Sequence, residues 1–316
     1  MRSALTRRLF VASAPLAALA AAASEGAPFF ARHHLAIGLQ LYTLGELIRT
    51  DLDGTLAALA KIGYRSVELA SFLGRSPRDL RAAFDRAGLH CQSAHIPAQP
   101  RAGEPFSLSG DLGPLVDAAH VIGLEYVVLP TFIFPDKLGP AHPGEDGGAY
   151  LVRAGKSMAV EDWRANARFL NDRGALLRKS GLKLGYHNHN LELAALGDTN
   201  GLQILLRETD PASVCFQMDV GWLAAGGHDP LQMLARYPGR FQLMHIKDIQ
   251  ASTVPNSELK LDPTEVGSGV LPWARILPAA LAAGTRSYFI EQEPPFQGSR
   301  LDSVDKSFKY LSHLAA

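Results

Sequence analysis

Short apolar runs alternate with amphipathic stretches along almost the whole chain. After residue 34, eight apolar runs bounded by turn residues have the length and composition of strands. These runs lie at 34–44, 65–70, 89–97, 125–133, 182–189, 213–222, 240–249 and 287–295. Stretches with helical spacing separate or follow them, at 53–62, 77–87, 112–122, 160–180, 201–208, 230–237, 270–284 and 303–314.

This alternation predicts an α/β fold with a parallel sheet. Glycines stand where several of the helices should end, which is typical of helix C-caps (Gly63, Gly88, Gly123, Gly181 and Gly284). Eight strand–helix units in a chain of this length predict a single-domain (β/α)8 TIM barrel over 31–316. An open doubly wound sheet is the rival, but "LYTLGELI" after the first strand lacks its Gly-rich phosphate turn.

Residues 1–30 read as an export signal peptide and a short linker. Arg7 and Arg8 precede an Ala-rich apolar run that ends near Ala23, and the stretch around them resembles a twin-arginine signal. An ordinary Sec signal is the alternative. The run is shorter than the ~20 residues that span a bilayer. We therefore expect a periplasmic or otherwise exported protein with no stable membrane insertion after signal cleavage.

One segment, 134–158, interrupts the alternation of predicted strands and helices. It is rich in Gly and Pro and follows the fourth strand, so we expect a long loop insertion on the face of a barrel that carries active sites. Loops of this length are either lids and interface elements or mobile insertions. The sequence leaves both open.

Charge and cysteine content narrow the class of partner. Lys plus Arg and Asp plus Glu both number 31, so no basic surface for nucleic acid is expected. Cys91 and Cys215 both lie in apolar strand-like runs, and we expect buried, reduced thiols. A homodimer is left open.

Polar residues gather at the carboxyl ends of the predicted strands, where a barrel builds its site. They are Gln40, Tyr42, Glu68, His95, His187, His189, Gln217, Asp219, His245, Lys247, Glu291 and Glu293. Side-chain alternation allows one inward-facing set from strands five to eight, namely His187, Asp219, His245 and Glu291. Two imidazoles and two carboxylates suit one divalent metal ion, with Mn²⁺ ranked first and Zn²⁺, Co²⁺ or Fe²⁺ as alternatives.

Several motifs in order resemble the xylose isomerase-like TIM-barrel superfamily, and within it the sugar phosphate isomerase/epimerase group. They are "IGLQLYTL", "SVELA", "YHNHNLEL", "MDVGW", "MHIKD", "VGSG" and "FIEQE". The resemblance implies a metal held by Glu, Asp, His and Glu from strands five to eight, with two of the carboxylates as an acid/base pair. Asp219, His245 and Glu291 match three of these positions. His187 stands where the family has glutamate, and a metal-bound imidazole is a poor substitute for a carboxylate base.

The resemblance implies an isomerase or epimerase that removes a proton next to the carbonyl of a sugar. We expect Glu291 or Glu293 as the base. Lys247 is expected to be an acid/base or electrostatic group with a pKa lowered by the cation, or simply an ion-pair partner of Glu293 or Glu68. The expected substrate-binding residues are Gln40, Glu68, His95, His189 and Trp222.

Other activities stay open. The same apparatus can serve a β-eliminating lyase or hydratase acting on 3-keto glycosides, and the histidine at position 187 favours that option. A non-catalytic sugar-binding barrel is more distant. A phosphodiesterase like endonuclease IV would need more metal ligands and a basic groove. No phosphate-binding arginine is evident near 267–269, so we expect a small, unphosphorylated sugar.

Overall fold

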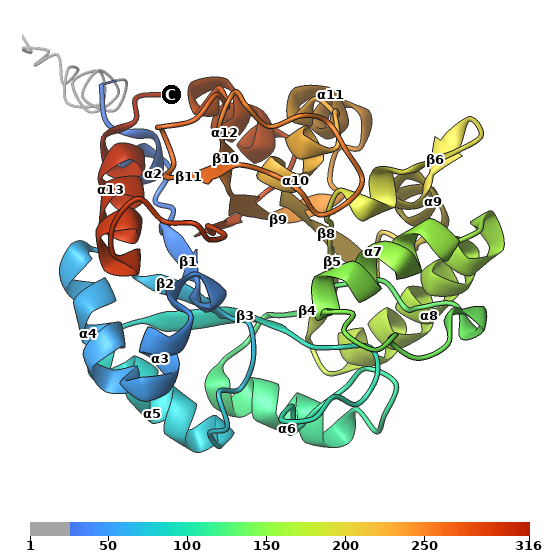
Figure 1. Cartoon of the computed structure of the whole chain (residues 1–316). Helices are drawn as coiled ribbons and strands as arrows, with labels where there is room; N and C mark the ends of the chain where they lie inside the picture. Colours follow the sequence, from blue (N-terminus) through green and yellow to red (C-terminus); the bar gives the residue numbers. More distant parts are fainter. Residues whose placement is uncertain (1–25) are drawn as a thin grey trace, which may run out of the picture.

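Eight parallel strands close into a barrel in the computed structural model, which describes residues 26–316. Around the ring the order is β1, β2, β3, β4, β5, β8, β9 and β12, and β12 pairs back to β1. Figure 1 shows the helices as an outer layer around this ring. The predicted (β/α)8 barrel is confirmed. The strands are β1 (Gly38–Gln40), β2 (Ser66–Leu69), β3 (His90–His95), β4 (Tyr126–Leu129), β5 (Lys183–His187), β8 (Val214–Asp219), β9 (Phe241–Ile246) and β12 (Ser287–Ile290).

The outer helices follow the predicted stretches closely. They are α4 (Leu52–Ile62), α5 (Pro77–Ala87), α6 (Gly113–Ile122), α8 (Val160–Lys179), α9 (Gly201–Glu208), α11 (Pro230–Arg236), α12 (Trp273–Ala282) and α13 (Arg300–His313). Shorter elements join them: α2 (Phe29–Arg32), η1 (Leu41–Leu44), α3 (Glu46–Thr50), η3 (Leu191–Leu193), α10 (Val220–Ala225), and the strand pairs β6–β7 (Ala195–Leu196, Thr199–Asn200) and β10–β11 (Asp248–Ile249, Pro263–Thr264).

Helix α5 illustrates how local sequence sets these boundaries. The Asp79 N–H donates to Ser76 Oγ at 3.2 Å, which caps the helix start, and Pro77 occupies the first turn. The helix ends at Gly88, which has a left-handed φ of 66° that side chains rarely adopt. Such caps return the chain to the next strand.

An apolar plug fills the lower part of the barrel. Its members come from four strands and are Tyr126, Val128, Cys215, Leu243 and Phe289. The fit is close, since a Cβ added to Gly38 would lie 2.5 Å from the Phe289 ring. Because side chains alternate, residues two and four places further along the same strands face the space above this plug. That places Gln217, Asp219, His245 and Lys247 over a dry, apolar floor.

The N-terminal boundary differs from the prediction. Phe29 and Phe30 are buried, and the Phe29 N–H donates to the carbonyl of Leu314 at 2.8 Å. Figure 1 shows α2 beside α13 at this point. The folded unit therefore includes two residues that were expected to belong to a linker. The predicted twin-arginine signal lies outside the described residues.

The 134–158 segment is more ordered than a Gly- and Pro-rich loop implies. It contains a short 3₁₀ helix η2 (Asp136–Leu138) and an α-helix α7 (Gly147–Ser157). The Ala149 N–H donates to the Asp146 side chain at 2.8 Å and starts α7. An Asp cap before two glycines is a weak helix signal, since glycine is a poor helix former.

Two further features concern the chain as a whole. Cys91 and Cys215 are both free and buried, as expected. Among residues 26–316, no helix combines the length and apolar character needed to cross a bilayer.

A candidate metal centre at the mouth of the barrel

Four potential metal ligands meet at the carboxyl ends of neighbouring strands. His187 ends β5, Asp219 ends β8, His245 lies near the end of β9, and Glu291 directly follows β12. Their ligand atoms all lie within 4.8 Å of one another, and all four residues are buried. The structure thus brings together the set that alternation selected.

Hydrogen bonds orient the two imidazoles toward this cluster. Glu68 Oε1 lies 2.5 Å from His245 Nε2, so Nε2 donates and Nδ1 faces Glu291 Oε2 at 3.0 Å. His187 Nδ1 lies 3.0 Å from Gln217 Oε1, which leaves Nε2 for the cluster. Carboxylate or amide partners behind ligating histidines are the usual way to fix a ring for metal binding.

Asp219 presents one carboxylate oxygen to the same space. Its Oδ1 accepts from the Trp222 N–H at 2.8 Å and so caps α10. Its Oδ2 is buried and accepts no hydrogen bond from the described residues, although Lys247 Nζ lies 3.2 Å away. A buried carboxylate oxygen with spare acceptor capacity, beside two imidazole nitrogens, fits a divalent first-row ion.

Lys247 is the main counter-charge of the cluster. It is 1% exposed, and its Nζ lies 3.2, 2.9 and 3.2 Å from carboxylate oxygens of Asp219, Glu291 and Glu293. Burial alone lowers the pKa of Lys247, but the three carboxylates raise it above its usual value. The lowering of this pKa that we expected beside a bound cation stays a prediction. Lys247 pairs with Glu293, as one interpretation held, and not with Glu68 in the contacts observed.

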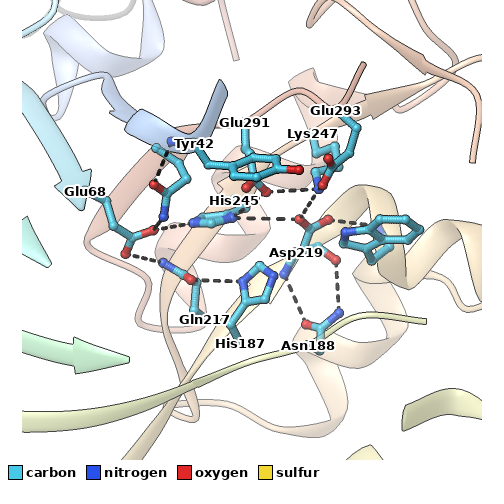
Figure 2. A network of polar contacts seen from close by, with 12 residues as sticks. Tyr42, Glu68, His187, Asn188, Gln217, Asp219, His245, Lys247, Glu291 and Glu293 are labelled. Atoms are coloured by element: carbon cyan, nitrogen blue, oxygen red, sulfur yellow. Dashed lines mark hydrogen bonds and ion pairs between the residues drawn. The ribbon is translucent and has the colours of Figure 1, made fainter. Parts of the chain in front are cut away.

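The pKa values of His245, Asp219 and Glu291 are set by burial and by neighbouring charged groups (Figure 2). Burial lowers the pKa of His245, but Glu291 and Glu68 outweigh it and raise that pKa to about 10. Burial raises the pKa of Asp219 to about 6, partly opposed by Lys247. Lys247 and His245 hold the pKa of Glu291 well below its usual value, despite its burial. Binding of an ion through His245 Nδ1 would displace the proton from that nitrogen.

A second network lies behind the ligands. Glu68 accepts from Gln40 Nε2 at 2.8 Å and from Gln217 Nε2 at 2.7 Å, and His95 Nε2 lies 3.2 Å away. Figure 2 shows Gln217 between Glu68 and His187. Glu68 was expected to bind substrate. It is fully buried, and its contacts instead orient the candidate ligands. The sequence analysis assigned no function to Gln217, although its position two residues before Asp219 places both side chains on the same face of the strand.

A cavity of about 620 Å³ opens next to the cluster. Of the strand-end residues selected from sequence, those that line it are Gln40, Tyr42, His95, His187, His189, Glu291 and Glu293. Asp219, His245 and Lys247 lie behind this lining. Lys247 is therefore placed to hold carboxylates rather than to touch the contents of the cavity.

Trp222 and Tyr42 occupy different positions relative to the cavity, and only Trp222 had been assigned to substrate binding. Trp222 does not line the cavity but supports Lys247, whose Nζ lies 4.8 Å from the centre of its ring. Tyr42 does line it, is 49% exposed, and borders Glu293, whose charge raises the pKa of the Tyr42 hydroxyl. Tyr42 stood at a predicted strand end, and no role was assigned to it.

The architecture defines a class: a closed (β/α)8 barrel with a buried N/O ligand cluster at the carboxyl ends of its strands. A profile of the family described as "Xylose isomerase-like TIM barrel" matches residues 56–312. The chain belongs to this family.

Curated relatives share only part of their length with this chain. An inosose dehydratase of Geobacillus kaustophilus is 24% identical over 205 residues, which is 63% of this chain and 62% of the relative. An inosose dehydratase of Clostridium perfringens is 34% identical over 118 residues, or 37% and 38% of the two chains. The similarity therefore spans less than two thirds of either relative.

A solved structure matches over a larger share. A sugar phosphate isomerase/epimerase from Parabacteroides distasonis is 25% identical and superposes with a TM-score of 0.68. The match covers 88% of this chain and 93% of the other. The similarity therefore covers most of both chains.

Proposed function

We propose that this protein is a divalent-metal-dependent sugar isomerase or epimerase that removes a proton next to the carbonyl of a keto sugar. The observation that carries the proposal is the buried cluster of His187, Asp219, His245 and Glu291 beside a cavity that Glu293 also lines. A bound divalent ion would supply Lewis-acid stabilisation of the negative oxygen that forms when the proton leaves. The donor set suits Mn²⁺ first, with Zn²⁺, Co²⁺ or Fe²⁺ as alternatives.

Glu293 is the proposed base. It lines the cavity, its side chain is 22% exposed, and its Oε1 lies 3.2 Å from Lys247 Nζ, which holds the carboxylate in place. Glu291 suits the ligand role better, because Lys247 and His245 lower its pKa and so weaken it as a base. Lys247 is then a positioning residue.

Two imidazoles can orient the sugar. His95 and His189 line the cavity, so their rings are placed to bind hydroxyls. Gln40 also lines it, but it is fully buried and its amide already donates to Glu68. Burial and the charge of Lys247 lower the pKa of His189 to about 3, which keeps its ring neutral. A neutral imidazole both donates and accepts a hydrogen bond, which matches a hydroxyl.

An unphosphorylated sugar suits this mouth. The Gly267 and Gly269 N–H groups, which would be natural phosphate donors in a glycine loop, donate to Asp248 Oδ2 at 2.9 and 3.3 Å. Trp273 Nε1 donates to the same oxygen at 2.9 Å. A buried carboxylate thus occupies the donors that a phosphate would need.

Dehydration is the second candidate, and the inosose dehydratases among the relatives favour it. The first step is the same proton removal. The electron pair left on carbon then forms a C=C bond, and a hydroxyl or glycosidic oxygen on the neighbouring carbon leaves and takes up a proton. His187 stands where the resemblance places a glutamate of the acid/base pair, and this is the feature of the chain itself that supports the second candidate.

Metal analysis and proton exchange test the proposal together. The purified protein should hold about one metal ion per chain, and Asp219→Ala and His245→Ala should lose it. During incubation with keto sugars or 3-keto glycosides in D₂O, deuterium should replace the hydrogen on the carbon next to the carbonyl. NMR measures this exchange. Glu293→Gln should retain metal and lose exchange.

The products decide between the candidates. A deuterated epimer or isomer supports the first, and an unsaturated product supports dehydration. A protein that binds no metal, or that binds metal and exchanges no proton in any of these compounds, contradicts the proposal and favours a sugar-binding role.

A further inference from the structure

The cavity has two chemically different halves. The half beside the ligand cluster is lined by Gln40, His95, His189 and Glu293, which are hydrogen-bonding groups. The other half is formed after β3 and β4 and by α7, and its lining is mainly apolar: Pro97, Pro130, Ile133, Phe134, Tyr150 and Leu151. A volume of about 620 Å³ is within the ~300–1,000 Å³ typical of pockets for drug-sized ligands, so a single sugar ring leaves part of it unfilled.

The apolar half is built from aromatic side chains that support one another. Phe132 is buried against Trp163, with ring centres 5.0 Å apart, and meets Phe134 edge-on at 5.7 Å. Phe134 in turn meets Tyr150 of α7 edge-on at 5.4 Å. Such edge-to-face pairs are favourable geometries for aromatic rings. Phe134 is still 36% exposed, so part of its ring is available to a ligand.

Polar contacts hold the two segments of this wall. Asn166 of α8 accepts from the Ile133 N–H at 2.6 Å and donates to the Ile133 carbonyl at 3.1 Å, which fixes the chain after β4. Arg153 makes two contacts of 2.8 Å to the Glu145 carboxylate, and its guanidinium lies 4.9 Å from the Tyr150 ring centre. The wall is therefore held in place before a ligand arrives.

The far end of α7 is tied to the opposite loop. Lys156 Nζ lies 2.6 Å from Glu258, which follows β10. A Cβ on Gly155 would lie 3.3 Å from Leu191, so α7 sits close on η3. The 134–158 insertion thus forms a wall of the cavity.

Few hydrogen-bonding side chains face this half. They are Gln99, Arg101, Thr131 and Tyr150. Gln99 already accepts from Ser109 at 3.1 Å, and the Tyr150 hydroxyl already donates to the Gly139 carbonyl at 3.0 Å. Gly147 and Gly148 line the cavity without side chains. A second sugar ring would bring several hydroxyls that need partners, whereas a flat apolar group needs none and can contact the Phe134 ring.

We propose that the substrate is a sugar that carries a flat, apolar substituent, such as an aryl glycoside, with the substituent against Phe134 and Tyr150. The location of the sugar end rests on the function proposed above. The substituent end rests only on the geometry of the wall.

Binding of paired glucosides tests this substrate class. Calorimetry on the purified protein, with and without EDTA, should show 4-nitrophenyl β-glucoside binding roughly tenfold more tightly than methyl β-glucoside. Phe134→Ala should reduce this ratio to near one, and Phe134→Trp should retain it. Leu176→Ala is the matched control, since Leu176 is an exposed apolar residue of α8 that does not line the cavity, and its ratio should stay near ten.

Four outcomes overturn the inference. The two glucosides bind with equal affinity, neither binds measurably, a disaccharide such as cellobiose binds as tightly as the aryl glucoside, or Phe134→Ala leaves the affinity ratio unchanged. Failure of the proposed reaction is separate, because it is read from metal content and proton exchange. If the protein binds no metal or exchanges no proton, the ratio of the two glucoside affinities in EDTA can still be measured and still tests the apolar wall.

Discussion

Lys247→Met removes the positive charge from the centre of three carboxylates. Lys247 is almost fully buried and lies within 3.2 Å of oxygens from Asp219, Glu291 and Glu293. Methionine has nearly the same length and is apolar, so it can still pack on Trp222. The substitution therefore isolates the charge from the packing.

The expected loss is large because three carboxylates lose the counter-charge that they share. Removing one partner of a buried ion pair typically costs about 3–5 kcal/mol of unfolding free energy. Lys309→Met is the control, since its pair with Asp305 is 2.6 Å long but exposed, and pairs of that kind contribute about 0–1 kcal/mol. The difference between the two variants measures what burial adds.

The loss should depend on pH with a definite sign. Burial raises the pKa of Asp219 to about 6 although Lys247 opposes it, so the folded protein takes up this proton more readily than the unfolded chain. Without Lys247 that pKa rises further. The variant should therefore be most destabilised at pH 8, where the carboxylates are ionised, and its loss relative to the wild type should shrink as the pH falls toward about 6.

Urea denaturation at pH 8 and pH 5, in EDTA and then with added Mn²⁺, measures these effects. Mn²⁺ should restore more unfolding free energy to Lys247→Met than to the wild type, since the ion replaces the missing charge. Equal stability of the variant and the wild type at pH 8 would refute the reasoning. So would a loss that is the same at both pH values.

Three further predictions concern other parts of the chain. Asn166→Ala should lower the unfolding free energy by about 2–3 kcal/mol in urea, because it leaves the Ile133 amide without its partner. Burial raises the pKa of Glu192 to about 7, so its ionisation lowers wild-type stability as the pH rises from about 4.5 to 7. Glu192→Gln should remove up to roughly 3 kcal/mol of that decline, measured by urea denaturation across the same range. Replacing Arg7 and Arg8 by Lys should stop export of folded protein, as followed by cell fractionation, and unchanged export would favour a Sec signal.

Much of the barrel was predictable because its signals are local. Strand and helix periods, and glycines after helices, are set by neighbours within a few residues. The two-residue alternation of strands predicted that His187, Asp219, His245 and Glu291 point into the barrel. In the structure their ligand atoms lie within 4.8 Å of one another. The insertion was misread because the cap at Asp146 precedes two glycines, and its helix depends on contacts with distant segments.

The order of strands and helices, the closed-barrel class and the candidate ligands can all be predicted from the chain, since alternation along a strand needs no knowledge of its neighbours. How those ligands are held depends on contacts that form only in the folded protein. Glu68 and His245 are 177 residues apart, and Glu68 and Gln217 are 149 apart, yet closure of β12 onto β1 brings them into hydrogen-bonding distance. The charge of Lys247 and the wall made by α7 likewise depend on contacts between segments that are far apart in the sequence.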